Sequence, residues 1–362
     1  MTFIDAIGIA NPAYRSKQMD IFSYMSETID FTAKEQKVLR YLYAKSGIET
    51  RYSVLSDFSP TADASDFYLP EDNYSPSIDL RLARYDEASV PLALEAIENC
   101  LKDSRSTSDE ITHLITVSCT GMSAPGMDTA IIKALKLSNQ IQRYNINFMG
   151  CYAALTGLQL ANTICTAQDN ARVLVVAVEL CTLHFQNQVS ADYNLSNMLF
   201  ADGAAAAVVT NVKEPGRSFA IHGFESDINH DGQEDMSWKI SSNGFLMKLS
   251  SYVPQLLKLG FRNILDSVLE KHGIPIGQVH KWAIHPGGKR ILDNVVQEFD
   301  LADDHIEASR QILRDYGNMS SPTILFVLKS LQDSASREAG QYIFTAGFGP
   351  GLTTETALLS YA

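Results

Sequence analysis

The sequence predicts a layered α/β protein with buried parallel strands. Short apolar, β-branched runs alternate along the chain with longer stretches that have helical spacing of apolar residues. No short repeat, low-complexity tract or long charge run interrupts this alternation. With 362 residues, of which 45% are hydrophobic, the chain can bury a large core. Its length fits two domains, or one domain built as two halves.

The predicted strands are the runs that are continuously apolar or β-branched. In chain order they are Thr112–Val117, Val173–Val178, Ala204–Thr210, Lys281–His285, Gln341–Ala346 and Thr354–Ser360. The predicted helices lie between them, at Ala88–Leu101, Gly126–Leu135, Cys151–Ala167 and Pro254–His272. Pro254 suits the start of the last helix, because a first helical turn tolerates proline.

The most polar interior stretch runs from Asn211 to Ser218 and contains a lysine, a glutamate, a proline, a glycine and an arginine in succession. Such a segment is the best candidate for a join between two halves. We therefore expect an N-terminal half over residues 1–212, which carries the candidate nucleophile, and a C-terminal half over residues 213–362.

The charge balance excludes several function classes. The 29 Lys and Arg residues stand against 42 Asp and Glu, and the net charge of -13 argues against a general nucleic-acid or anionic-membrane binder. Residues 1–11 lack the basic and apolar parts of a signal peptide, and no later window has the apolar length of a membrane span. We expect a cytoplasmic protein in which any anionic ligand needs a local basic cluster.

The cysteines are expected to be reduced thiols, so that one of them can be reactive. They are odd in number and form no CxxC pair, which disfavours a disulfide framework and a zinc site. They are Cys100, Cys119, Cys151, Cys165 and Cys181.

Cys151 follows Gly150 and stands at the first turn of a predicted helix rich in small residues. Exposed N–H groups and the helix dipole stabilise a thiolate there, so we expect the pKa of this thiol to fall from about 8.5 toward the physiological range. Most cysteines are nevertheless small buried hydrophobic residues. The assignment of a nucleophile therefore depends on its partners.

Two further residues are candidate partners. His285 ends an apolar strand and is followed by Pro286 and paired glycines that leave space around the imidazole. Strand ends of α/β folds are where ligands bind. Asn318 follows a glycine and precedes Pro322, at a predicted loop-to-helix junction. A thiolate needs a base beside it, and an amide can donate a hydrogen bond to a developing enolate oxygen.

A series of motifs accompanies these three residues in order along the chain. They are Ile7-Gly-Ile-Ala-Asn-Pro, Ser46-Gly-Ile-Glu-Thr-Arg-Tyr, Thr112-His-Leu-Ile, Pro125-Gly-Met-Asp, Gly150-Cys, Arg172-Val-Leu-Val-Val, Leu199-Phe-Ala-Asp-Gly-Ala-Ala-Ala, Ile284-His-Pro-Gly-Gly, Tyr316-Gly-Asn-Met-Ser-Ser and Gly347-Phe-Gly-Pro-Gly-Leu-Thr. By them the chain resembles, over nearly its whole length, the chalcone and stilbene synthase superfamily of type III polyketide synthases, as a bacterial-like member.

The resemblance implies the thiolase fold, an α/β fold of five layers, αβαβα, built from two similar halves and normally dimeric. It implies that Cys151 accepts the acyl group of a starter acyl-coenzyme A, that His285 is its base and later an oxyanion donor, and that Asn318 is the second donor. Malonyl-coenzyme A would supply the extending enolates by decarboxylation, and the chain would close to a pyrone or phenolic ring. Coenzyme A thioesters are the implied substrates, with no metal or redox cofactor.

The resemblance also implies a substrate cavity, with Phe200 as an aromatic gatekeeper. Its other implied lining residues are Cys119, Cys181, Leu183, His184, Ser196, Trp238, Met247, Ser320, Gly347, Phe348, Gly349 and Pro350. Cys119 and Cys181 stand where plant chalcone synthases carry threonines, and Trp238 where they carry a glycine. These differences in the cavity imply a starter or product different from that of plant chalcone synthases. Ala124 replaces a methionine that reaches across the dimer in plant relatives, so that contact is not expected here.

Coenzyme A carries several phosphate charges, so an acidic protein needs cations where it binds. The family places such cations just before the motif at Ser46. The corresponding candidates are Lys45, Lys37, Arg40 and Arg51. A solvated helix face is an equal alternative for Lys37 and Arg40.

Three other functions compete with this interpretation. A type III ketoacyl synthase shares the fold and the Cys, His and Asn residues but condenses once onto an acyl carrier protein, and the Gly-Phe-Gly-Pro-Gly loop disfavours it. A cysteine hydrolase also orders its residues Cys, His, Asn, but the papain-type surroundings are absent. A catalytically inactive binding protein is least expected, because all three chemical residues are present.

Overall fold

We describe the protein from a computed structural model that covers residues 1–59, 67–68, 75–212, 218–233, 235–250, 253–335 and 337–362, with only the backbone of residues 253–259. The strands are β1 (Thr2–Ala10), β2 (Tyr14–Lys17), β3 (Thr50–Ser53), β4 (His113–Ser118), β5 (Gln142–Asn147), β6 (Arg172–Leu180), β7 (Asp202–Thr210), β8 (Phe219–Ile228), β9 (Met236–Ser241), β10 (Gly244–Leu249), β11 (Val279–Ile284), β12 (Tyr342–Gly349) and β13 (Thr353–Tyr361). The helices are α1 (Gln18–Thr28), α2 (Ala33–Lys45), α3 (Ile78–Asp103), α4 (Met127–Leu135), α5 (Ala153–Ala167), α6 (Ala191–Leu199), α7 (Val253–His272), α8 (Lys289–Phe299), α9 (Asp303–Tyr316) and α10 (Thr323–Asp333).

Nine strands form one sheet in the order β11-β12-β13-β8-β1-β7-β6-β4-β5. β4 is parallel to β5 and to β6, and β11 is parallel to β12, whereas the other pairings are antiparallel. The expectation of a parallel sheet is therefore only partly correct, since β7 runs antiparallel to both of its neighbours, β1 and β6, and β13 runs antiparallel to both of its neighbours, β8 and β12. The two parts of the sheet meet where residues 2–4 of β1 pair with residues 219–221 of β8.

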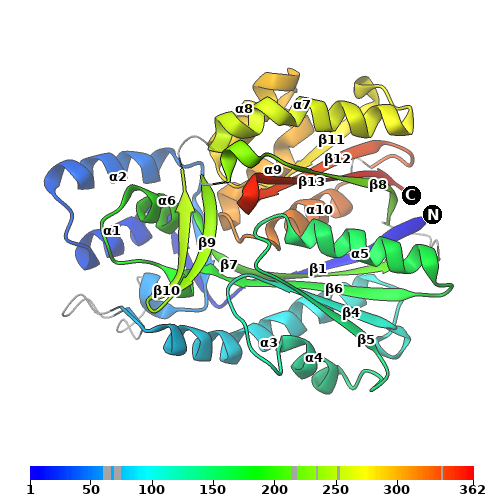
Figure 1. Cartoon of the computed structure of the whole chain (residues 1–362), viewed down its shortest axis with the longest axis horizontal. Helices are drawn as coiled ribbons and strands as arrows, with labels where there is room; N and C mark the ends of the chain where they lie inside the picture. Colours follow the sequence, from blue (N-terminus) through cyan, green and yellow to red (C-terminus); the bar gives the residue numbers. More distant parts are fainter. Residues whose placement is uncertain (60–66, 69–74, 213–217, 234, 251–252, 336) are drawn as a thin grey trace.

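The elements stack in five layers (Figure 1). Helices α3 and α4 cover the outer face of the β1, β4–β7 part, and α7 and α8 cover the outer face of the β8, β11–β13 part. α5 and α10 lie between the two parts. This is the αβαβα arrangement that the resemblance implies.

The central layer is possible because α5 is made of small and apolar residues. A Cβ atom added to Gly157 would lie 3.0 Å from Cγ1 of Val175, so the helix axis approaches β6 very closely. Ala153, Ala154 and Ala161 of the same helix are completely buried. Packing of α5 against β6 and against β13 fixes the start of this helix, and with it the position of Cys151.

All predicted strands and helices exist, with shifted ends. The helix expected at Ala88–Leu101 is longer, because it begins at Ile78 and contains Pro91. Helices α1, α6, α8 and α9 and strands β1–β3, β5 and β8–β10 were not predicted from the sequence, and α2 and α10 were implied there without bounds. The predicted join at Asn211–Ser218 falls largely on residues 213–217, outside the described residues.

One end of the layered core carries the smaller elements. α2, α6 and the hairpin of β9 and β10 gather there, close to the N-terminus of α8 (Figure 1). β11 also ends there, with α8 beginning five residues later. The candidate site lies among these elements.

Candidate active site

Cys151 lines a cavity of about 1010 Å³. Cys151 precedes α5, which begins at Ala153, so it lies in the turn before the helix rather than in its first turn. Gly150 has a φ of +94° and its Cα faces Pro350, while Gly349 packs against Tyr152 and the Cys151 amide. The glycine-rich C-terminal loop therefore holds the nucleophile turn in place.

His285 and Asn318 line the same cavity as Cys151. His285 follows β11, and its amide donates to the carbonyl of Ala346 at 2.8 Å. The side chain of His285 is completely buried, yet neither ring nitrogen has a hydrogen-bond partner among the described residues. Buried polar groups normally have partners, so this imidazole is suited to a ligand in the cavity.

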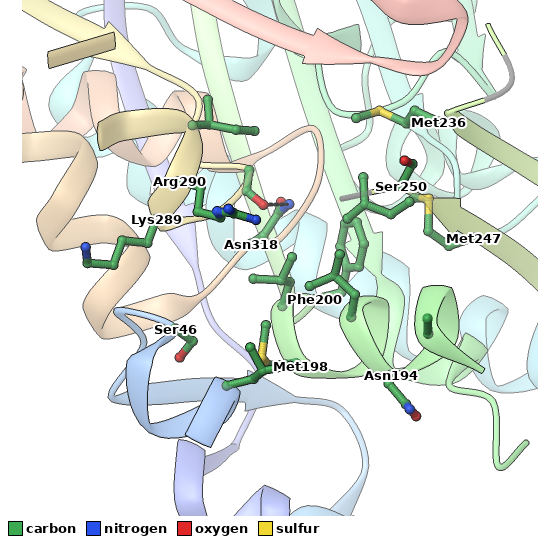
Figure 2. Close-up of a pocket in the computed structure, with 18 of the residues that line it drawn as sticks. Ser46, Asn194, Met198, Phe200, Met236, Met247, Ser250, Lys289, Arg290 and Asn318 are labelled. Carbon is green, nitrogen blue, oxygen red and sulfur yellow. Dashed lines mark hydrogen bonds between the residues drawn. The ribbon is translucent and has the colours of Figure 1, made fainter. Parts of the chain in front are cut away.

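Asn318 is fixed by backbone contacts on both sides. Its amide donates to the carbonyl of Leu199 at 3.0 Å, and its carbonyl accepts from the amide of Ala201 at 2.9 Å. The side-chain oxygen accepts from the Ser320 amide at 2.8 Å, and Nδ2 donates to the Gly287 carbonyl at 3.4 Å. Figure 2 shows Asn318 at the cavity wall. The same contacts place Phe200, between Leu199 and Ala201, beside Cys151 and Cys181.

Burial is the largest cause of the pKa shifts of Cys151 and His285. It raises the pKa of the Cys151 thiol to about 12, and hydrogen bonds from the Ser320 and Asn318 side chains offset it only in part. The expectation that the helix N-terminus lowers this pKa is therefore wrong. Burial also lowers the pKa of His285 to about 3. If the imidazole takes up the thiol proton, the thiolate and the imidazolium can form an ion pair, whereas either charge alone would be unpaired in a buried site.

The sequence analysis missed a buried carboxylate behind the thiols. Glu179 of β6 is completely buried and accepts from the Cys119 amide at 2.9 Å, the Thr120 hydroxyl at 2.8 Å and the Ser321 hydroxyl at 2.7 Å. Burial raises its pKa to about 7 despite these hydrogen bonds. Glu179 stands among the apolar residues of β6, and no motif around it indicates a functional role.

An aromatic cluster closes the inner wall of the cavity. The indole of Trp238 donates to the Cys119 carbonyl at 2.6 Å, and His184 stacks on Phe245 with ring centroids 4.2 Å apart. His184 bonds through Nε2 to the Thr120 carbonyl at 2.7 Å and accepts at Nδ1 from the Phe245 amide at 3.1 Å. Burial lowers the pKa of His184 to about 3, which keeps the ring neutral. These contacts fix the hairpin of β9 and β10 over the site.

The space beyond this cluster is small. A separate cavity of about 20 Å³ is lined by His184 and Ser196 and shares Cys181, Phe200, Trp238 and Met247 with the main one.

Seven predicted lining residues remain besides those that line the smaller cavity. Four of them line the main cavity and three line neither. Cys119, Ser320, Phe348 and Pro350 line it. Leu183 is buried in the core, and Gly347 and Gly349 pack against Tyr152. These three positions support the walls without forming the cavity surface.

The predicted coenzyme A cations separate into three groups. Lys45 lines the cavity and is exposed, whereas Lys37 and Arg40 are exposed outside it. The assignment of Arg51 is wrong. Its side chain is 2% exposed and donates to the carbonyls of Asn197 at 2.7 Å and Phe200 at 2.6 Å, so it supports the gatekeeper segment from inside.

Sequence reasoning also missed part of the mouth of the cavity. Lys34 of α2 and Lys289 and Arg290 of α8 line it. Lys289 and Arg290 directly follow Gly287 and Gly288 in the sequence, and this position next to the His285 motif could have indicated that they lie near the site.

The described residues lack metal-ligand clusters and membrane-spanning helices. They contain no cluster of three or more His, Cys, Asp or Glu side chains that could hold a metal ion. None of the helices in the described ranges is long and apolar enough to cross a membrane. All five cysteines are buried, with free thiols.

Two family models match the chain. The model for the N-terminal domain of chalcone and stilbene synthases matches residues 1–212, and the model for the C-terminal domain matches residues 223–361. Type III polyketide synthase C of Arabidopsis thaliana is 30% identical over 98% of this chain and 94% of its own length. The alpha-pyrone synthesis polyketide synthase-like Pks18 of Mycobacterium tuberculosis is 29% identical over 98% of this chain and 90% of its own length.

Solved structures share the fold. The crystal structure of PKS-I from the brown alga Ectocarpus siliculosus has a TM-score of 0.92 and 30% identity, and the match covers 100% of this chain and 98% of that one. The C-terminal type III polyketide synthase domain of Steely1, a type I/III hybrid from Dictyostelium, has a TM-score of 0.91 and 25% identity, with 99% of both chains covered.

Proposed function

The chain belongs to the chalcone and stilbene synthase family and is a type III polyketide synthase, and we propose that its acyl transfer and condensation take place on coenzyme A thioesters at Cys151. The observation that carries this proposal is that Cys151, His285 and Asn318, from three distant parts of the chain, line one cavity. The matches along the whole chain do not favour a single-condensation ketoacyl synthase or a hydrolase.

In the proposed first step His285 takes the proton of Cys151. The thiolate attacks the carbonyl carbon of the starter thioester, the bond to the coenzyme A sulfur breaks, and the departing thiolate takes up the proton. The acyl group then remains on Cys151 as a thioester. No redox group or metal ion is needed for this balance.

In the second step malonyl-coenzyme A loses carbon dioxide, and the electron pair of the broken bond forms an enolate. Hydrogen bonds from His285 and Asn318 stabilise the enolate oxygen, and each such donor contributes about 2.7–4 kcal/mol in comparable sites. The neutral imidazole, whose pKa is about 3, supports its role as a donor. The enolate carbon then attacks the thioester carbonyl, the bond to the Cys151 sulfur breaks and releases the thiolate, and the chain, now two carbons longer, remains on the coenzyme A of the extender.

We propose a pyrone or phenolic product, with the pyrone favoured. The cavity that Trp238 and His184 line together is only about 20 Å³, so the main cavity has little room to extend on that side. A short chain that closes through its own enol oxygen needs the least space. The name of the mycobacterial relative, which refers to alpha-pyrone synthesis, supports the same choice.

The test is incubation of the purified chain with malonyl-coenzyme A and a panel of short, aromatic and long-chain acyl-coenzyme A starters, without carrier protein. We expect condensation products in the mass spectrum and none from the Cys151→Ala variant. Hydrolysis without condensation, or condensation retained by Cys151→Ala, would refute the proposal.

We also propose a homodimer formed along β5. This strand is an edge of the sheet, and Gln142, Arg143, Tyr144 and Asn145 of it are exposed. An open edge invites pairing with a second strand. Light scattering should give a dimer for the wild type and a monomer for Tyr144→Glu. A wild-type monomer at micromolar concentration would contradict the assignment.

A further inference from the structure

The mouth of the cavity has cations on two walls. Lys34 and Lys45 line it from α2, and Lys289 and Arg290 line it from α8. The chain as a whole carries a net charge of -13, so this local excess of positive charge opposes the general field of the protein.

Lys289 is already engaged within the protein. Its Nζ lies 2.6 Å from Oδ2 of Asp293, and Oδ1 of the same carboxylate lies 2.8 Å from Nη1 of Arg310. The stem of Lys289 packs against Gly47, where an added Cβ atom would lie 3.4 Å from the Lys289 Cβ. Figure 2 shows the amino group of Lys289 directed away from the cavity. Lys289 therefore joins α8 to the end of α2.

Arg290 is placed differently, although it is the next residue. It is exposed, and it forms no ion pair or hydrogen bond with any residue in the described ranges. Figure 2 shows its guanidinium directed into the cavity, on the side of Asn318. A guanidinium has five N–H donors in a fixed fork and matches two oxygens of a phosphate at once. An unpaired arginine at a cavity mouth is thus suited to a phosphorylated ligand.

The proposed function supplies that ligand, and the inference rests on it. We propose that Arg290 binds phosphate groups of the coenzyme A part of both starter and extender thioesters, from the wall opposite Lys45. In coenzyme A the pantetheine arm separates the reacting sulfur from the phosphates. The phosphates can therefore stay at the mouth while the acyl group reaches Cys151. Arg290 then recognises the part that all substrates share.

The test is a series of thioesters with the same acyl group on coenzyme A, 3′-dephospho-coenzyme A, phosphopantetheine and pantetheine. For Arg290→Ala we expect the KM for coenzyme A thioesters to rise about tenfold with kcat retained, the equivalent of one lost charge-assisted hydrogen bond. With the pantetheine thioester, which has no phosphate, the variant and the wild type should be equal. The member of the series at which the effect disappears identifies the phosphate that Arg290 binds.

Two variants serve as controls. Arg290→Lys keeps the charge but loses the fork, and should recover part of the affinity. Arg262→Ala removes an arginine of α7 that pairs with Glu298 outside the cavity, and should leave every KM unchanged. An unchanged KM for coenzyme A thioesters in Arg290→Ala, or an equal loss with the pantetheine thioester, would contradict the proposal.

Binding of coenzyme A itself separates this inference from the proposed function. Calorimetry with Cys151→Ala protein, which cannot turn over, should show about tenfold weaker binding after the second substitution Arg290→Ala. If Cys151→Ala protein binds coenzyme A and the double variant binds it equally well, only the role of Arg290 is wrong. If neither protein binds it and the wild type forms no product, the proposed function itself is wrong.

Discussion

A Cβ atom added to Gly150 would lie 2.3 Å from Cδ of Pro350. The residue before the nucleophile therefore touches the C-terminal loop, about two hundred positions away in the sequence, with no space for a side chain. Gly150 also has a φ of +94°, which side chains rarely allow. Two independent restraints thus fix the backbone from which Cys151 projects.

Gly150→Ala should abolish condensation and destabilise the protein. The backbone conformation would cost about 1–3 kcal/mol, and the contact with Pro350 would add an overpacking penalty of about 1–3 kcal/mol. Since either Pro350 or the turn must move, Cys151 would leave its position. Urea unfolding and product formation measure the two effects.

Gly273→Ala is the matched control. Gly273 also has a positive φ, of +65°, but no atom lies within 4 Å of an added Cβ. This variant should lose about 1–2 kcal/mol through the backbone alone and keep its activity. If both variants behave alike, the contact with Pro350 does not position the nucleophile.

His285→Ala should make Cys151 unreactive at neutral pH. Burial raises the pKa of this thiol to about 12, so without the imidazole to receive the proton little thiolate forms. We expect iodoacetamide to alkylate Cys151 at least about a hundredfold more slowly at pH 7 than in the wild type, with a rate that increases about tenfold per pH unit up to pH 10. Peptide mass spectrometry distinguishes Cys151 from the other thiols. Wild-type reactivity in the variant would show that another group activates the thiol.

Trp238→Ala should lengthen the products. The indole lines both the main cavity and the smaller one, so its removal should widen the space between them and allow a longer intermediate to fold inward. Mass spectrometry should show products with at least one more malonyl-derived unit. Trp238→Phe is the control, because a ring still packs near His184 and Phe245 while the hydrogen bond to Cys119 is lost. An unchanged product pattern in Trp238→Ala would exclude this wall as the limit on chain length.

The three catalytic candidates could be predicted from the sequence because each lies next to the end of a helix or strand that the local sequence pattern reveals. Cys151 follows a glycine before a helix, His285 ends a strand, and Asn318 lies between Gly317 and a helix. Arg51 has no such local feature. Whether the side chain of an arginine in a short strand such as β3 reaches solvent or the core depends on its partners, here carbonyl groups of Asn197 and Phe200, nearly 150 positions away.

The thiol pKa was mispredicted for a related reason. The turn before α5 was visible in the sequence, but the burial of Cys151 under the hairpin of β9 and β10 and the C-terminal loop was not. The desolvation produced by that burial outweighs the effect of the helix N-terminus.

Glu179→Gln should stabilise the protein at alkaline pH. Burial raises the pKa of Glu179 from 4.5 to about 7, so between these values the folded state binds more protons than the unfolded state. The contribution of Glu179 to stability therefore decreases as pH rises through this window, by about 2 kcal/mol between pH 5.5 and 8. Glutamine is neutral throughout and can keep hydrogen bonds to the same neighbours. The difference in unfolding free energy between variant and wild type should increase by this amount, as measured by urea unfolding at the two pH values. Glu98→Gln, at an exposed residue of α3, provides the reference, and an equally small pH dependence in both variants would show that Glu179 is ionised in the folded protein throughout.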